Sequence, residues 1–150
     1  MSKARNLFIE VSAALLIVLF VYTAINKLSD LNRFQWTLYK SPLLQQYRYF
    51  VSCAVPVAEL ITAILLLIPA TRSKGFLCSL ILMSLFTIYV AYMLAFIPNL
   101  PCSCGGLISS MNWTNHLIFN LFFTGLAYAA WIITKKDRII AIIRSSRKPV

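Results

Sequence analysis

The chain has 150 residues, of which 60% are hydrophobic and only 12% are charged. Soluble domains are about half apolar and about a quarter charged, so this composition argues for a membrane protein. The formal net charge is +10, but the basic residues stand at the ends of apolar runs and form no basic stripe, which argues against nucleic-acid binding. We therefore expect membrane lipids, and no nucleic acid, among the partners.

Four apolar runs are long enough to cross a bilayer. A span needs about 20 residues, and its backbone groups must be satisfied within a helix. The runs are residues 7–25, 49–68, 76–97 and 117–134. Their only charged residues are Glu10 and Glu59. Because the first run is long for a signal peptide and no small-residue cleavage site follows it, we expect it to remain as a span. The sequence predicts one all-α integral membrane domain over residues 1–150, built as a four-helix bundle.

The basic residues predict how this bundle is oriented. Of the 14 Lys and Arg residues, ten lie on the side of the two termini and four lie in the connection between the first two runs. By the positive-inside rule, both termini are expected in the cytoplasm, and the segment from Asn99 to His116 is expected outside. Disulfides persist in such an oxidising compartment. Residues 135–150 are predicted to form a basic amphipathic tail on the anionic inner leaflet.

The first outer connection, from Lys27 to Tyr47, is predicted to contain a short interfacial helix. Its apolar residues recur near helical spacing, and Ser29 is expected to cap it. Trp36 and Tyr39 suit a headgroup interface. Ser41 and Pro42 resemble a cap followed by proline at the first helical position, so the second span is expected to begin above the membrane.

Cys102 and Cys104 are the strongest candidates for chemistry. They stand one residue apart, after Pro101 and before two glycines that permit a tight turn. A disulfide between them closes a very small ring, and strain makes such a bond easier to reduce. Strained and exposed disulfides are the labile or catalytic ones. We therefore predict a redox-active pair.

Two other interpretations of the pair remain open. The first is a structural disulfide, in which Cys53 is an additional thiol that bonds one member of the pair. The second is a Cu(I) site completed by Met111 or His116, because thiolates and other soft ligands favour Cu(I). Cys78 lies in apolar company and is expected to behave as a small buried hydrophobe.

Glu59 and His116 are the polar residues of the spans that invite a functional hypothesis. A carboxylate inside the membrane is costly and is treated as functional by default. Pro56, one turn earlier, frees the carbonyl of Ser52 and bends the helix. The alternative is a protonated Glu59 bonded to a tyrosine or asparagine of another helix, such as Asn120. His116, at the outer end of the fourth run, is placed to accept a thiol proton.

Five segments of the chain together resemble the MauE/DoxX family of four-helix, redox-associated membrane proteins. They are FVYTAINKLSDLNRF, PVAELITAILLLIPATRSKG, FTIYVAYML, PCSCGG and NWTNHLIFN, and they extend over nearly the whole chain. The resemblance implies a bacterial inner-membrane protein that helps to form or isomerise disulfides of exported proteins, of the type linked to methylamine utilisation. It implies a thioredoxin-like exported partner and a disulfide-containing client.

The resulting hypothesis is a thiol–disulfide oxidoreductase with Cys102, Cys104 and His116 as its catalytic residues. Electrons would pass to a quinone near Glu59, Tyr22 and Tyr89, or along a thiol relay. No resident metal is expected under this hypothesis. A non-catalytic accessory subunit with a structural disulfide and a copper-handling membrane protein are the competing hypotheses.

Overall fold

The computed structural model describes residues 3–96 and 113–146, and nearly all of them are helical. The helices are α1 (Lys3–Ser29), α2 (Leu31–Tyr39), α3 (Arg48–Leu67), α4 (Arg72–Phe96) and α5 (Trp113–Ser146). Four of them contain stretches long and apolar enough to cross a membrane. These stretches are Lys3–Ser29, Arg48–Leu67, Arg72–Phe96 and Thr114–Asp137. The prediction of an all-α protein with four spans is confirmed.

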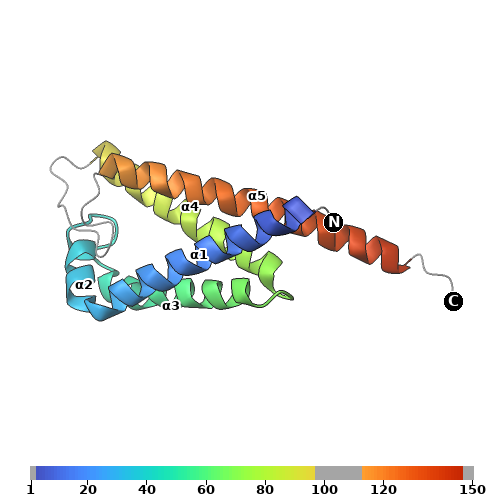
Figure 1. The fold of residues 1–150 in the computed structure, drawn as a ribbon. Coiled ribbons are helices and arrows are strands. Elements are labelled where there is room, and N and C mark those ends of the chain that lie inside the picture. The colour runs from blue at the N-terminus through green and yellow to red at the C-terminus, as the bar shows by residue number, and fades with distance from the viewer. Residues whose placement is uncertain (1–2, 97–112, 147–150) are drawn as a thin grey trace.

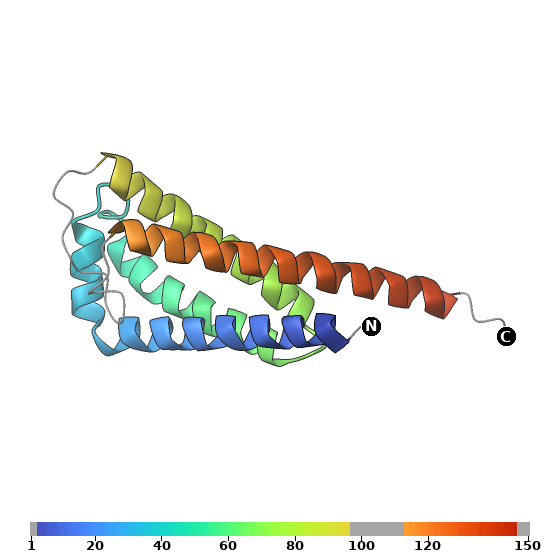
Figure 2. The same ribbon diagram turned by 45° about the horizontal axis from the view of Figure 1, so that its top comes forward.

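The four long helices run along a common direction, and α2 lies across one end of them (Figure 1). We call this the α2 end, and the opposite end, where α1 begins and α5 finishes, the terminal end. The most extensive packing is between α4 and α5 and between α1 and α3. Contacts of α3 with α4 and of α1 with α5 join these two pairs. The turned view in Figure 2 shows the same pairing, with α5 running past the rest of the bundle at the terminal end.

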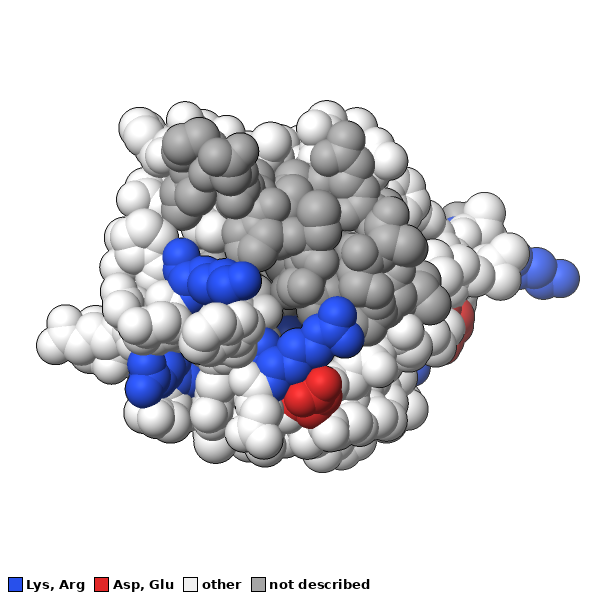
Figure 3. All heavy atoms as spheres, turned by 90° about the vertical axis from the view of Figure 1, so that its left-hand side faces the viewer, with Lys and Arg blue, Asp and Glu red and all other residues white. Residues whose placement is uncertain are grey.

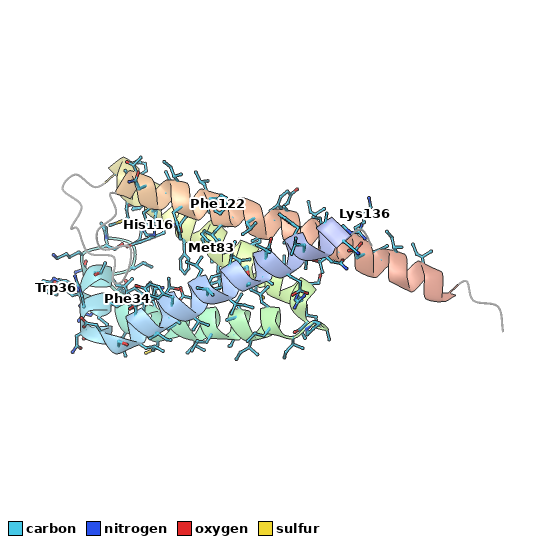
Figure 4. All side chains as sticks on the ribbon, in the orientation of Figure 1. Phe34, Trp36, Met83, His116, Phe122 and Lys136 are labelled. Atoms are coloured by element: carbon cyan, nitrogen blue, oxygen red, sulfur yellow. The ribbon has the colours of Figure 1, made fainter. Side chains whose placement is uncertain are left out.

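The bundle buries a narrow apolar core and leaves a broad apolar surface. The core consists of Leu16, Phe20, Ala63, Leu66, Phe76, Met83, Phe123, Ala127 and Ala130, with Ile9 and Ala13 towards the terminal end of α1. Large apolar side chains remain exposed on every long helix, among them Val18, Phe50, Ile88 and Phe122. In Figure 4, Met83 lies among the helices, whereas Phe122 is on the outer side of α5. An apolar surface of this extent requires lipid, so the chain is a multi-pass membrane protein.

The short helix predicted in the first connection is α2, but its capping differs from the prediction. The N-cap is Asp30, not Ser29, because the helix α1 continues through Ser29. The Asp30 carboxylate accepts a hydrogen bond from the backbone N–H of Arg33 at 3.1 Å. Asp30 therefore satisfies a backbone donor that no residue within the helix could bond.

Two other boundaries also differ from the sequence-based expectation. Ser41 and Pro42 do not start the second span, because residues 41–47 form turns and α3 begins at Arg48. The carbonyl of Ser41 instead accepts backbone hydrogen bonds from Leu44 and Gln45 within these turns. The basic tail is a continuation of α5 up to Ser146.

Two ion pairs fasten the terminal end. Arg5 of α1 contacts Asp137 of α5 at 2.9 Å, and Arg72 of α4 contacts Glu10 of α1. Glu10 is largely exposed, with 62% of its side-chain surface accessible. Each pair joins helices that are distant in sequence, so together they hold α1 against α4 and α5.

Gly75 allows α4 to approach α3 closely, and this predicts a specific sensitivity. A Cβ at position 75 would lie 2.8 Å from Leu66 N and 2.9 Å from Leu65 C, and these backbone atoms cannot easily move aside. We expect Gly75→Ala to lower the free energy of unfolding in detergent by about 1–3 kcal/mol. Gly125→Ala is the matched control, because a Cβ there has no neighbour within 4 Å. Equal losses in both variants would contradict this packing argument.

Candidate functional site

A buried ion pair between Lys27 of α1 and Glu59 of α3 lies inside the bundle. Lys27 Nζ donates to Glu59 Oε1 at 2.6 Å. The Glu59 side chain is 1% exposed and that of Lys27 is 19% exposed. Lys27 follows the buried Phe20 by seven residues, so it returns to the interior face of α1. The pair thus joins two helices across the interior of a lipid-embedded bundle.

Aromatic rings enclose the ammonium of Lys27. Its Nζ lies 5.9 Å from the ring centroid of Phe34 on α2 and 5.6 Å from that of Phe86 on α4. Cation–π attraction of this kind is stronger where water is excluded. Helices α1, α2, α3 and α4 therefore all contribute to the surroundings of one charge.

The second oxygen of Glu59 is left without a hydrogen-bond partner. The hydroxyl of Thr23 is close to the carboxylate, but it donates to the carbonyls of Leu19 at 3.0 Å and Phe20 at 3.2 Å. Glu59 Oε2 is buried and has no partner among the described residues. A buried acceptor without a partner is unfavourable, because it has lost its hydrogen bonds to water and gains none in the folded protein. This atom therefore has free capacity to bind a hydrogen.

Helix α3 carries a polar line from the α2 end down to Glu59. Ser52, Pro56 and Glu59 are all buried on one face, as their spacing of four and three residues requires. Pro56 has no N–H, so the helical hydrogen bond to the Ser52 carbonyl is missing. Gln35 Nε2 of α2 donates to Ser52 Oγ at 3.2 Å. Ser52 and Glu59 are thus polar side chains on the buried face of a largely apolar helix.

His116 begins the interior face of α5. His116, Asn120, Phe123 and Ala127 follow one another at helical spacing, and the last three are buried. His116 is half-buried, and the charge of Lys27 acts on it. Asn120 Nδ2 is buried without a partner among the described residues. Figure 4 shows His116 at the same end of the bundle as Phe34, so the histidine belongs to the α2 end.

The predicted thiol pair, Cys102 and Cys104, lies outside the described residues. The helices on either side of it both terminate at the α2 end, where α4 finishes at Phe96 and α5 starts at Trp113 (Figure 1). Cys53 and Cys78 are free thiols. Cys53 is exposed on α3, next to the buried Ser52, and Cys78 is half-buried on α4.

The three residues considered for a quinone site lie on three helices and differ in their burial. Glu59 is interior, but Tyr22 follows Phe20 by two residues, which is about 200° around the helix, and it is 38% exposed. Tyr89 is half-buried on α4. A quinone site near Tyr22, Glu59 and Tyr89 stays a prediction. Across residues 3–96 and 113–146, no group of three or more His, Cys, Asp or Glu side chains could hold a metal ion.

Sequence reasoning missed Lys27 as the partner of Glu59. The first span was expected to end at Ile25, so Lys27 was assigned to the connection and counted as a topology signal. In the structure Glu59 Oε1 bonds Lys27 rather than a tyrosine or asparagine. A usable signal was available, since a carboxylate inside a membrane generally requires a cationic partner and Lys27 is the nearest base to the end of a neighbouring span.

The fold and the site together define a four-span helical membrane protein with a charged pair enclosed in its bundle. A family model described as methylamine utilisation protein MauE matches residues 5–134. The chain therefore belongs to the MauE family of membrane proteins linked to methylamine utilisation. No match was found among curated proteins or solved structures.

The ion pair predicts strongly non-additive effects on stability. Glu59→Leu leaves the Lys27 charge uncompensated and is expected to lower the free energy of unfolding by about 3–5 kcal/mol. Adding Lys27→Met should restore most of that loss, because the pair is then replaced by apolar groups. Glu10→Leu is the matched control and should cost at most about 1 kcal/mol, because the Glu10 side chain is 62% exposed and Arg72 Nε keeps its hydrogen bond to the Leu66 carbonyl. Unfolding in detergent–denaturant mixtures measures the wild type, the two single variants of the pair, their double variant and Glu10→Leu. Additive losses from Glu59→Leu and Lys27→Met would show that the two side chains do not act as a pair.

Proposed function

We propose that this protein is a membrane thiol–disulfide oxidoreductase that supports disulfide formation in exported proteins used for methylamine utilisation. The observation that carries the proposal is the convergence at one end of the bundle. The segment bearing Cys102 and Cys104 is joined to two helices that terminate there, beside His116. The buried Lys27–Glu59 pair lies further along the interior from the same end. Membership of the MauE family supports a role in this context.

The proposed chemistry is thiol–disulfide exchange, in which the electrons and protons balance without a resident cofactor. A client thiolate attacks the Cys102–Cys104 disulfide, so one S–S bond breaks and a mixed disulfide forms. The second client thiolate then displaces the bound sulfur. Two electrons and two protons have passed from the client to the pair, and the client holds a disulfide. The disulfide of a thioredoxin-like exported protein re-oxidises the pair by the same two steps.

His116 serves this exchange as a proton carrier. An attacking thiol must lose its proton, and a departing thiolate must gain one. A neutral imidazole is suited to both steps. In this proposal, His116 moves protons between the exchanging thiols and the polar interior behind it.

The charge distribution supports an orientation with the α2 end outside and both termini in the cytoplasm of a bacterium. With Lys27 buried in the ion pair, only Arg33, Lys40 and Arg48 remain as basic residues of the first connection. Figure 3 looks onto the α2 end, where a few Lys and Arg side chains and one small acidic patch are visible. The positive-inside rule therefore favours this orientation in the inner membrane more strongly than the sequence alone did.

Replacement of the thiol pair tests the proposal directly. The double variant Cys102→Ser, Cys104→Ser should abolish oxidation of a reduced model dithiol peptide by the detergent-purified, oxidised protein. The double variant Cys53→Ser, Cys78→Ser is the control and should keep the wild-type rate, since neither thiol belongs to the pair. Single-turnover mixing followed by thiol alkylation and mass spectrometry gives the rate. Undiminished exchange in the Cys102/Cys104 variant would refute the catalytic role and leave the accessory-subunit hypothesis.

His116→Gln separates proton transfer from the thiol chemistry itself. The amide keeps similar size and polarity but does not carry protons at neutral pH. We expect the exchange rate to fall by at least about 100-fold near pH 7, while the fraction of oxidised Cys102–Cys104 at equilibrium stays unchanged. The same rate assay, combined with redox titration against glutathione, distinguishes the two quantities. A shifted redox equilibrium with an unchanged rate would contradict the proposed role.

A further inference from the structure

The Lys27–Glu59 pair is not expected to contribute much to the stability of the fold. Taking two charges out of water costs several kcal/mol for each ion, and a buried pair repays this only when its remaining polar atoms are satisfied. Here Glu59 Oε2 is buried and has no hydrogen-bond partner within residues 3–96 and 113–146, and the Glu59 side chain is only 1% exposed. The pair thus retains a vacant acceptor in the most protected part of the bundle.

Polar groups connect this acceptor with the α2 end. On α3, the Ser52 carbonyl, which lacks a hydrogen bond from Pro56, lies about two turns before Glu59. Ser52 Oγ accepts a hydrogen bond from Gln35 of α2. On α5, His116 is followed one turn deeper by Asn120, whose Nδ2 is buried and unpartnered. These groups lie on the interior faces of their helices, where the other side chains are mostly apolar.

We propose that Glu59 is an internal proton-binding site in which Lys27 serves as the fixed counter-charge. The proton binds at Oε2, while Oε1 keeps its hydrogen bond from the Lys27 ammonium. Binding converts a carboxylate–ammonium pair into a carboxylic acid beside an ammonium, and no other bond changes. The ligand is therefore a single proton exchanged with the α2 end.

The coupling of this site to the thiols rests on the proposed function. When a client thiol attacks, the proton that it gives up passes through His116 and is held on Glu59. The proton then returns to the sulfur that leaves as a thiolate. Over one complete exchange, Glu59 therefore neither gains nor loses a proton. Glu59 thus stores a proton between two steps, which lets thiolates form without releasing acid into the surroundings.

Each helix around the site contributes a defined group to its electrostatics. Lys27 of α1 is the titratable group that contacts Glu59, and its charge also acts on His116 of α5. Helix α2 contributes the Phe34 ring and α4 contributes the Phe86 ring, neither of which titrates. Changes in the protonation of Glu59 can therefore be separated from those of its neighbours with few variants.

Infrared spectroscopy of the full-length protein in lipid nanodiscs tests the site without any thiol chemistry. A pH titration between about pH 4 and about pH 9, the range to which burial moves carboxyl groups, should show a protonated-carboxyl band that appears reversibly as the pH falls. Glu59→Gln should remove this band. Glu10→Gln, which alters the other span carboxylate, should keep it. A band that survives Glu59→Gln, or a Glu59 that never titrates, would overturn the proposal even if thiol exchange occurs.

The coupling is tested by difference spectra between the oxidised and the dithiol-reduced protein. We expect a change in the Glu59 band in the wild type and its loss in Glu59→Gln, with the exchange rate of that variant lowered about tenfold near neutral pH. Glu59→Asp should restore part of the rate, because it keeps the carboxyl group. A titrating Glu59 with no redox-dependent change would remove the coupling but leave the proton site, and a wild type without exchange would refute the proposed function alone.

Discussion

The buried contact between Lys27 and Glu59 is the constraint on which the rest of the α2 end depends. A carboxylate in the interior of a lipid-embedded bundle must find a partner, because neither lipid nor water compensates it there. The partner is on α1, so α1 has to continue as a helix past the apolar run and through Ser29. The next residue, Asp30, is then the one that caps α2. Helix α2 consequently starts where its Phe34 ring can approach the Lys27 ammonium. One ion pair thereby fixes the length of α1 and the placement of α2 across the bundle.

The distribution of side chains is the reverse of that in a soluble bundle. Large apolar groups such as Phe50 and Ile88 are exposed, while small and polar groups such as Ser79 and Asn120 are buried. Because lipid is as apolar as leucine, these helices gain little from burying hydrocarbon and associate through close packing and interhelical polar contacts. Alanines at positions 63, 127 and 130 and the near-contact of Gly75 with the α3 backbone provide that packing. The hydrogen-bonded hydroxyls of Thr87 and Thr124, 3.2 Å apart, add a polar contact between α4 and α5.

The sequence was sufficient for the spans and insufficient for the contacts inside them. Apolar runs of membrane length predict helices reliably, because the bilayer allows almost no alternative. Because charged residues are expected to mark the ends of apolar spans, the first span was predicted to end before Lys27. Ser29 was an acceptable cap by residue type, but α1 includes Ser29 and the cap of α2 is Asp30. Which face of α1 meets α3 depends on packing between segments that are far apart in sequence. A local sequence pattern does not contain that information. Tyr22 illustrates this, since its position in the span suggested an interior role and its helical phase places it on the outer side.

The two ends of the bundle differ in how completely their ion pairs are enclosed. At the terminal end, the pairs Arg5–Asp137 and Arg72–Glu10 join helices at positions where at least one partner retains access to solvent. Such pairs can break and re-form at little cost, so they suit fastening. At the α2 end the Glu59 carboxylate is enclosed, with 1% of its side chain exposed. Among the described residues, Glu59 Oε2 and Asn120 Nδ2 are buried without a hydrogen-bond partner, and so are Arg5 Nε and Asp137 Oδ2 at the terminal end. Selection for stability alone would be expected to replace such groups with apolar ones. The enclosed Lys27–Glu59 pair lies at the end to which the cysteine-bearing segment is attached, which is the arrangement that the proposed proton store requires.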